Sequence, residues 1–245
     1  MSSVSSEALA QLAPSGTLRA AINMSNFLLV TGKTADRDPE GVSPDMARAV
    51  ADRLGVSLKL LPYKTPGELG DAAKDGVWDI GNIGAEPQRA KTIDFTAAYV
   101  EIESTYLVPA DSPLQSIADV DKAGVRIAYP PRSAYGLWLD NNIKNAELVP
   151  AEGSGAVFEL FTAEKLDAMA GLRPGLIGDV DKLPGSRILD GQFSAVQQAV
   201  GTPKGNPEAA AFLSAFVEEM KASGFVAGLI EKHGVVGRLT VAPAV

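Results

Sequence analysis

Apolar and polar residues form two different patterns along the first hundred positions of the chain. Short apolar runs of the length of a buried strand lie at residues 18–23, 56–63 and 77–83. Segments with helical signals separate these runs, at residues 43–55 and 65–76. In the first of them, Met46, Val50 and Leu54 recur at helical spacing, and Ser43 is the expected N-cap. This alternation predicts parallel strands covered by crossover helices, which is an α/β fold.

A second series of the same kind follows after residue 110. Its expected helices lie at residues 117–124, 133–143 and 155–165, and its expected strands at residues 125–129, 146–151 and 166–172. Two long β-like segments, near 104–109 and 195–201, bracket this series. We therefore expect two lobes joined by two crossover strands. The predicted first lobe comprises residues 14–104 plus 199–238, and the second comprises residues 105–198. A cleft between two lobes is a preferred place for small-molecule binding.

The amino-acid composition disfavours some classes of binding partner. A hydrophobic content of 46% with 21% charged residues is typical of a globular protein. The net charge of −8 and the isoelectric point near 4.8 disfavour nucleic acid and anionic membrane surfaces, because both carry negative charge. The N-terminal residues lack a basic region and a continuous apolar run, so they do not resemble a secretory signal. Either the protein stays in the cytoplasm or a signal peptide was removed from it.

Cysteine and histidine, two residue types that are common in catalytic and metal sites, are almost absent. The chain has no cysteine, which excludes disulfides, thiolate catalysis and zinc–sulfur sites. Its one histidine, His233, is followed by a glycine near the C-terminus and is expected to cap a helix. We therefore expect no catalytic residues, no metal site and no cofactor.

The order of several motifs resembles that of the family 3 extracellular solute-binding proteins of ABC importers. The motifs are GTLRAAIN (16–23), GVSPDMARAVADRLGV (41–56), DGVWDI and EPQRAKTIDFTAAY (75–99), ADSPLQSIADVDKAGVRIAY (110–129) and KGNPEAAAFLSAFVEEMKASG (204–224). The resemblance implies a two-lobed type 2 periplasmic binding fold, in which each lobe is a mostly parallel sheet flanked by helices. It also implies a periplasmic, monomeric binding protein without enzyme activity. Such a protein binds a small carboxylate-containing solute, an organic acid or an amino-acid-like compound, by closure of its two lobes about a hinge. It then delivers the solute to the permease of the importer.

Arg89 is the expected centre of the site. It follows a Gly–Ala–Glu–Pro turn, where a helix is expected to begin and where a cation is unfavourable unless an anion arrives. In the resembled family the arginine of a T-P-x-R turn, matched here by E-P-Q-R, binds the carboxylate of the ligand. A guanidinium fits a carboxylate through two parallel hydrogen bonds. The alternative is an ion pair of Arg89 with Glu86 or Asp94. We expect Arg89 to lie exposed in its turn and to contribute little stability.

The resemblance implies further contacts with the ligand. The start of the helix in PPRSAYGLWL matches a turn of the family, with Ser133 as N-cap and the amides of Ala134 and Tyr135 directed at the ligand. The remaining expected contacts are residues near predicted strand ends and in a crossover: Asn23, Asn26, Tyr63, Gly84, and Gln197 or Gln198. Turn formation is an equal alternative for the two asparagines, and core packing is an equal alternative for Tyr63.

The chain departs from the family pattern where the ligand's ammonium group is held. Amino-acid-binding members carry an aspartate just after the strand matched by LDAMAGL, whereas this chain has Leu172 and Arg173 there. The threonine of the T-P-x-R turn is replaced by Glu86. A carboxylate without an ammonium, or a ligand whose cation lies elsewhere, therefore fits best, and Arg173 is a candidate second contact for an anion.

Two alternatives to a binding protein of an importer stay open. One is a dehydratase-like enzyme on the same scaffold, which would need a general acid in the cleft, with Glu86 and Glu152 as candidates. The other is a cytoplasmic ligand sensor, which the absence of a signal peptide favours.

Overall fold

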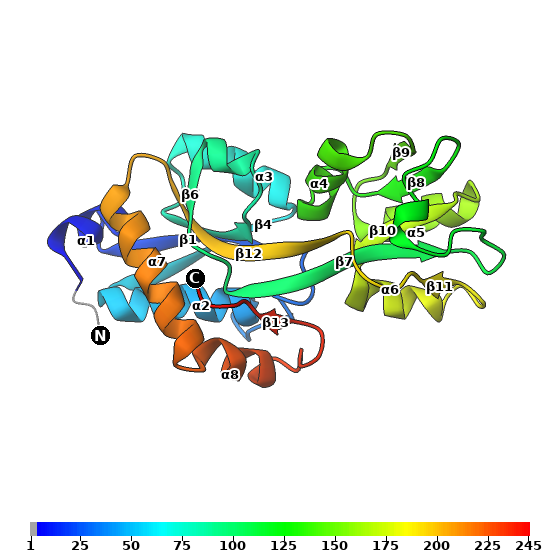
Figure 1. Cartoon of the computed structure of the whole chain (residues 1–245). Helices are drawn as coiled ribbons and strands as arrows, with labels where there is room; N and C mark the ends of the chain where they lie inside the picture. The colour runs from blue at the N-terminus through cyan, green and yellow to red at the C-terminus, as the bar shows by residue number, and fades with distance from the viewer. Residues whose placement is uncertain (1–3) are drawn as a thin grey trace. The chain divides into compact units, whose positions relative to one another are not determined.

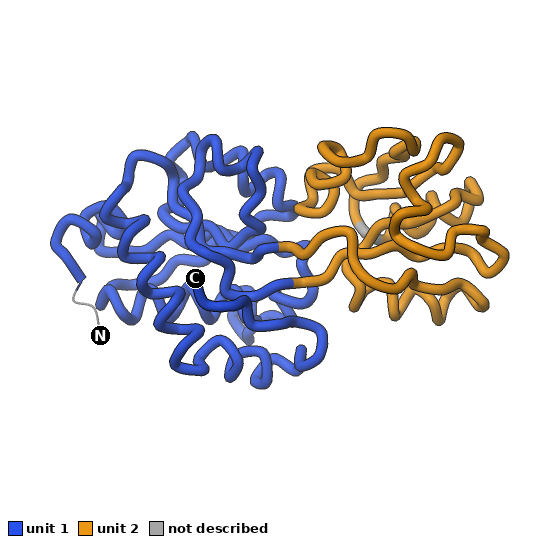
Figure 2. Tube along the Cα trace, in the orientation of Figure 1, with its two compact units in different colours: residues 1–101, 197–245 blue, residues 102–196 orange. Residues whose placement is uncertain are grey.

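The chain folds into two compact units, and the computed structural model describes residues 4–245. Unit 1 comprises residues 1–101 and 197–245, and unit 2 comprises residues 102–196 (Figure 2). The chain thus passes from one unit to the other twice, inside strand β7 (Val100–Val108) and inside strand β12 (Ser194–Pro203) (Figure 1).

Three parallel strands form the centre of unit 1. Strand β1 (Thr17–Asn23) pairs with β4 (Ser57–Tyr63) on one side and with β5 (Ile80–Gly84) on the other. Antiparallel strands extend this sheet: β12 pairs with β5, β6 (Ile93–Phe95) pairs with β12, and β13 (Thr240–Val241) pairs with the start of β7. A short hairpin of β2 (Gly32–Lys33) and β3 (Pro39–Glu40) stands apart from it.

The helices of unit 1 are α1 (Ser6–Leu12), α2 (Val42–Leu54), α3 (Pro66–Asp71), the short 3₁₀ turns η1 (Ala72–Asp75) and η2 (Arg89–Lys91), α7 (Pro207–Ala222) and α8 (Phe225–Lys232). Helix α2 buries its apolar stripe and ends at Gly55 in the left-handed conformation that glycine favours. The prediction that Ser43 is the N-cap is wrong, because α2 begins at Val42 with Gly41 as its cap and Ser43 is buried inside the unit. His233 is the C-cap of α8, as predicted.

Unit 2 repeats the arrangement on a smaller scale. Its parallel strands are β8 (Arg126–Tyr129), β9 (Glu147–Pro150) and β10 (Ala168–Leu172), and β10 also pairs antiparallel with β7, as does β11 (Arg187–Ile188). Its helices are η3 (Ile117–Asp119), α4 (Ala134–Asn142), α5 (Ser154–Ala163) and α6 (Arg173–Val180). Residues 117–124, predicted as a helix, form only the 3₁₀ turn η3, whereas α6 was not predicted.

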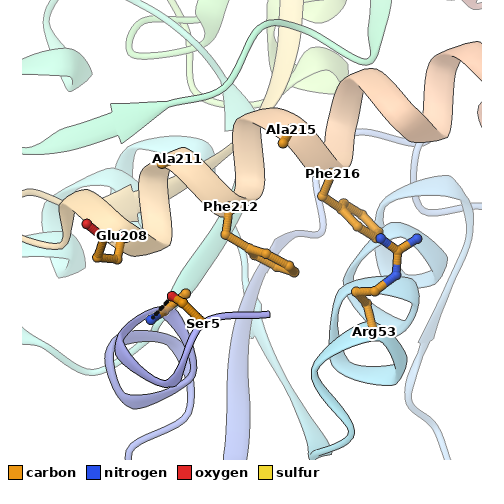
Figure 3. Close-up of a pocket in the computed structure, with 8 residues that line it drawn as sticks. Ser5, Arg53, Glu208, Ala211, Phe212, Ala215 and Phe216 are labelled. Atoms are coloured by element: carbon orange, nitrogen blue, oxygen red, sulfur yellow. Dashed lines mark hydrogen bonds between the residues drawn. The ribbon is translucent and has the colours of Figure 1, made fainter. Parts of the chain in front are cut away.

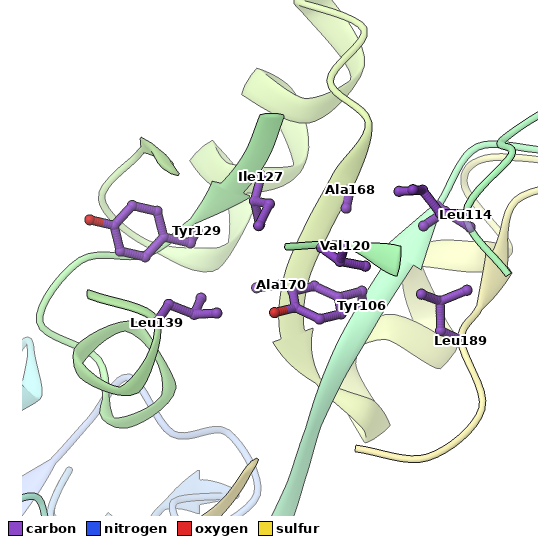
Figure 4. Packing of buried hydrophobic residues seen from close by; sticks show 10 residues of the cluster. Tyr106, Leu114, Val120, Ile127, Tyr129, Leu139, Ala168, Ala170 and Leu189 are labelled. Carbon is purple, nitrogen blue, oxygen red and sulfur yellow. The ribbon is translucent and has the colours of Figure 1, made fainter. Parts of the chain in front are cut away.

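Each unit has an apolar core of its own. In unit 2, Tyr106, Ile127 and Leu139 join side chains from β7, β8 and α4 in one buried cluster (Figure 4). In unit 1, Trp78 is buried beside Leu69, and its indole N–H donates to the Leu69 carbonyl at 3.2 Å. Burial of apolar surface on both faces of these sheets holds the strand ends in place, and the strand ends carry the predicted site residues.

Candidate functional site

The carboxyl ends of the three parallel strands of unit 1 share one edge of the sheet. Asn23 at the end of β1 is paired with Tyr63 at the end of β4, and Ile22 is paired with Asn82, so β5 ends beside them at Gly84. Ligands of α/β sheets bind at this edge, because the loops that leave parallel strands gather there. Three predicted site residues, Asn23, Tyr63 and Gly84, are therefore brought to one side of the unit.

Arg89 lies on the loop that leaves β5, and it is buried with 6% of its surface exposed. Its Nη1 donates to the Gly84 carbonyl at 2.9 Å, and its aliphatic stem lies against Gly70. The expectation of an exposed arginine is therefore wrong, because the side chain packs against Gly70 of α3 and its guanidinium donates to the Gly84 carbonyl. The Asp94 carboxylate, one of the suggested partners, lies 3.9 Å from Lys204 instead.

Glu86 lies on the same loop and is half-buried. Burial raises the pKa of its carboxyl above the ordinary value, and the nearby Arg89 guanidinium opposes that shift. Among the residues that the structure describes, the Glu86 carboxylate forms no hydrogen bond and no ion pair, so the suggested Arg89–Glu86 ion pair does not form.

The two asparagines after β1 shape the turn that follows the strand. Asn23 Oδ1 accepts hydrogen bonds from the amide of Ser25 at 3.1 Å and from its hydroxyl at 2.8 Å. Asn26 Oδ1 accepts from the amide of Leu28 at 3.2 Å. Turn formation, the alternative named above, thus occupies these oxygens, and a ligand contact by either asparagine stays a prediction.

The two neighbouring glutamines of β12 differ in burial because successive side chains of a strand point to opposite faces. Gln198 is paired with Gly84, only 3% exposed, and its side chain hydrogen-bonds the hydroxyl of Tyr99. Gln197 is half-exposed, and its carbonyl accepts the Ala85 amide at 2.8 Å. Gln197 is therefore the accessible one of the pair, beside the loop that carries Arg89.

A buried polar cluster lies next to the carboxyl edge of the unit 1 sheet, and the sequence did not predict it. Its members are Ser43, Asn82, Tyr99 and Gln198. The Tyr99 hydroxyl lies 2.7 Å from Ser43 Oγ and donates to Asn82 Oδ1 at 3.3 Å. Burial raises the pKa of Tyr99 to about 12, so the hydroxyl stays protonated. The cluster ties α2 to β5 and β12. The signal that could have found it is Asn82, a polar residue within the apolar run 77–83.

In unit 2 the first turn of α4 follows the carboxyl end of β8. Ser133 is the N-cap, as predicted: its Oγ accepts the Gly136 amide at 2.9 Å and donates to the Pro130 carbonyl at 2.9 Å. Ala134 is buried in that turn, and burial raises the pKa of Tyr135 above its usual range. Ligand contacts of Ser133, Ala134 and Tyr135 stay predictions.

Arg173 follows β10 and is already engaged within unit 2. Its Nε lies 2.5 Å from Glu103 Oε2, and its Nη2 donates to the Gly191 carbonyl. Since an ion pair with Glu103 offsets its charge, Arg173 is a weaker candidate for an anion contact than the sequence suggested. Leu172 ends β10 and directly precedes α6, so the end of β10 carries no acidic residue.

A shallow groove of about 250 Å³ lies elsewhere in unit 1, between α1, α2 and α7 (Figure 3). Phe212 and Phe216 form its apolar wall, and the Arg53 guanidinium lies over Phe216 while it is paired with Glu219. Arg53 stands in the last turn of α2, which leads to the beginning of β4, so this groove belongs to the amino ends of the strands. None of the predicted site residues lines it.

Two kinds of feature are not found in residues 4–245. No group of three or more histidine or acidic side chains is arranged to hold a metal ion. No helix in that range is both long enough and apolar enough to cross a membrane.

Solved structures with this fold are numerous. The reconstructed ancestral amino acid-binding protein AncCDT-1, described as a precursor of cyclohexadienyl dehydratase, is 24% identical, with 91% of this chain and 98% of that chain covered and a TM-score of 0.72. A mutant of ArgBP from T. maritima is 20% identical, with 93% and 99% covered and a TM-score of 0.73. An amino acid ABC transporter substrate-binding protein from Streptococcus pneumoniae, bound to L-arginine, is 23% identical, with 91% and 96% covered and a TM-score of 0.72.

These likenesses show the fold, the two-lobed type 2 periplasmic binding fold that the sequence predicts. A search of curated proteins finds no match. The family model for bacterial extracellular solute-binding proteins, family 3, matches residues 7–236. That match spans nearly the whole chain and includes both units, and the protein therefore belongs to the family 3 bacterial extracellular solute-binding proteins.

Proposed function

We propose that the protein binds a small solute through a carboxylate at the carboxyl edge of unit 1 and delivers it, in the periplasm, to the permease of an ABC importer. The observation that carries this proposal is the buried guanidinium of Arg89, held by the Gly84 carbonyl where β5 ends. A guanidinium that is fixed and shielded from water binds a carboxylate more strongly than an exposed one, because the local dielectric is low.

The other residues of this edge fit the same role. Gln197 offers an amide beside the Arg89 loop, and Tyr63 offers a half-buried aromatic wall at the end of β4. The relatives of known structure add a class of ligand, since one is bound to L-arginine, one is complexed with lysine and one is a cysteine-binding protein. An amino acid or a related organic acid is the class of solute that we infer.

Ligand-induced thermal stabilisation tests the proposal. A ligand that binds only the folded state stabilises it by about 2.7 kcal/mol at a concentration 100 times its dissociation constant. We expect hits among amino acids and organic acids, and none among compounds of the same size that lack the carboxylate, such as the corresponding amides. Stabilisation by the amides as strong as that by the acids would contradict the role of the carboxylate.

An enzyme on the same scaffold is a second candidate, favoured by one observation. Glu86 has a raised pKa, which is what a general acid requires, and it lies on the Arg89 loop. Glu152, the other acid considered, is exposed on a loop of unit 2 and is unsuited to that role. Incubation with prephenate, followed by product detection, decides between the two: turnover that is lost in Glu86→Gln would support an enzyme, and the absence of product supports a binding protein.

A further inference from the structure

The C-terminal residues of the chain lie along the beginning of the crossover strand β7. Strand β13 pairs antiparallel with the first two residues of β7, Val100 and Glu101 (Figure 1). The contact continues one residue further, since the Ala242 amide donates to the Tyr99 carbonyl at 3.1 Å. Residues 239–245 thus form a strap across this point. The strap lies outside the part of the chain that matches the family, because that match ends at residue 236.

Two side chains of α7 hold the strap in place. Lys221 Nζ donates to the Pro243 carbonyl at 2.8 Å and lies 2.6 Å from Glu218 Oε1. The Glu218 carboxylate also accepts the Val245 amide at 3.3 Å. Only 4% of the Lys221 side chain is exposed. An ammonium removed from water is costly to leave without partners, so these contacts fix the strap to unit 1.

Tyr99, the residue before β7, is fixed within unit 1 as well. Its amide donates to the Gln198 carbonyl at 2.8 Å, and its hydroxyl belongs to the buried polar cluster described above. The strap supplies the donor for its carbonyl, through the Ala242 amide. Tyr99 is fully buried, and a buried carbonyl without a donor is costly. The strap therefore completes the hydrogen bonding of the point from which β7 leaves unit 1.

The pairings of β7 leave a short interval at the boundary between the units. The strap pairs with β7 as far as Glu101, the last residue of unit 1 before the crossing. Strand β10 pairs with β7 from Ser104 onward, within unit 2. Ile102 and Glu103 belong to neither of these two pairings. Strand β12 is also a neighbour of β7 in the sheet, but it crosses the boundary itself and can bend together with β7.

We propose that the strap is a brace that holds the beginning of β7 to unit 1 and so confines the bending of this crossover to Ile102 and Glu103. A hinge is a small number of residues that absorb changes in φ and ψ while the segments on both sides stay rigid. Without the strap, the flexible part of β7 would extend back towards Tyr99. A longer hinge leaves the two units more arrangements to lose when they close on a solute. The inference goes beyond the proposed function, since it holds whatever the solute is.

Two variants of the full chain release the strap by different routes. Thr240→Pro places in β13 a residue that cannot donate to a ladder, and no core packing is lost because Thr240 is exposed. Thr240→Ala keeps the amide and is its matched control. Lys221→Met removes the donor to the Pro243 carbonyl and keeps an apolar stem. Its control is Lys182→Met, which removes an exposed lysine that pairs with Asp179 in unit 2.

Hydrogen exchange without ligand tests how far the release extends. In Thr240→Pro, the amides of residues 100–103 should exchange at least about tenfold faster than in Thr240→Ala, while the amides of β1 keep their rates. Lys221→Met should act in the same direction relative to Lys182→Met. The acceleration at Ile102 and Glu103 is the informative part, since loss of an edge strand alone exposes only the residues that it pairs with, Val100 and Glu101.

Spin labels measure the same effect as a distance between the units. The chain has no cysteine, so Arg48→Cys on α2 and Glu159→Cys on α5, both at exposed positions, provide the two labelling sites. The width of the distance distribution without ligand should increase by about half in Thr240→Pro, because the connection is flexible over more residues. The width should be unchanged in Thr240→Ala.

Three outcomes would overturn the inference, and each leaves the proposed function standing. The first is faster exchange that stays within residues 100 and 101, which would make β13 an ordinary edge strand. The second is an unchanged distance distribution in Thr240→Pro, whatever the exchange rates are. The third is an equal effect of Thr240→Ala, which would assign the change to the threonine side chain. If Thr240→Pro does not fold, Lys221→Met and its control are judged by the same criteria.

Discussion

Replacement of Arg89 by alanine removes the guanidinium on which the proposed function depends. A charge-assisted hydrogen bond contributes roughly 1.5–3 kcal/mol, and truncation of one partner of a shielded charge pair costs about 2–5 kcal/mol, because the other charge is left unpaired. At about 1.4 kcal/mol for each factor of ten, Arg89→Ala should weaken binding by roughly 30-fold to a few thousandfold. Arg89→Lys should recover only part of this loss, since an ammonium cannot form the two parallel hydrogen bonds.

The structure adds a stability cost that the sequence did not predict. Arg89 is buried and its Nη1 donates to the Gly84 carbonyl, so the alanine variant also loses an internal hydrogen bond and its buried stem. We expect a loss of about 1–3 kcal/mol of unfolding free energy, which for a chain of this length lowers the melting temperature by about 2–4 °C per kcal/mol. Loss of affinity must therefore be separated from loss of stability.

A matched control in the same unit makes that separation. Leu12→Ala removes a fully buried side chain from α1, on the side of unit 1 where the strands begin, and should lower the melting temperature without changing the residues of the strand edge. Calorimetric affinity and the melting temperature without ligand are measured for each variant. If Arg89→Ala binds within threefold of the unmodified protein while its melting temperature falls, Arg89 is structural and the proposed carboxylate site is wrong. If Leu12→Ala weakens binding as much as Arg89→Ala, the affinity loss reflects stability alone.

Three further predictions concern motion, pH and a single methyl group. The chain crosses between its two units twice, so we expect them to move about these crossovers and ligand to reduce the radius of gyration in solution scattering; an unchanged radius at saturation would contradict closure. Burial raises the pKa of Asp45, but hydrogen bonds from Lys232 and His233 outweigh it, and the net pKa is lowered. A lowered pKa adds stability that is present above the unfolded-state pKa, about 3.9, and is lost as pH falls from there through the folded-state pKa. Asp45→Asn should therefore destabilise at pH 7 in urea titrations, and the difference should shrink only as pH falls below about 4. Gly136→Ala should cost about 1–3 kcal/mol in the same assay, since its Cβ would lie 2.2 Å from the Pro130 carbonyl oxygen, and an unchanged midpoint would refute this close contact.

Several features were predictable because they depend on residues close together in the chain. The periodicity of Met46, Val50 and Leu54 predicted α2, and the alternation of apolar runs with helical segments predicted the parallel strands of both units. Ser133 was predicted as an N-cap from its place before a helical segment, and the structure confirms it. Local hydrogen bonds and the spacing of side chains along one element are sufficient for such inferences.

Features that depend on contacts between distant segments were not predictable in the same way. Serine is a favoured N-cap residue, yet Ser43 is buried against Tyr99. The fold places α2 over the sheet, where the Ser43 hydroxyl becomes the hydrogen-bond partner of the Tyr99 hydroxyl. Helix α6 escaped notice because it is short and follows β10 without a polar cap, with Leu172 in that position. Packing against β10 and β11, rather than its own pattern, holds it in helical form.

The amino-acid sequence by itself determined the α/β class, the family and the residue types that meet at the strand ends. Whether a charged side chain there is exposed or buried, and paired or unpaired, was decided by tertiary structure. Arg89 is buried because its side chain lies against Gly70 of α3 and reaches the Gly84 carbonyl. Gln198 is buried because β12 places it opposite that glycine, and Arg173 is paired with Glu103 from a neighbouring strand. The energy of a charge depends on the water and the counter-charges around it, and only the folded chain brings those together.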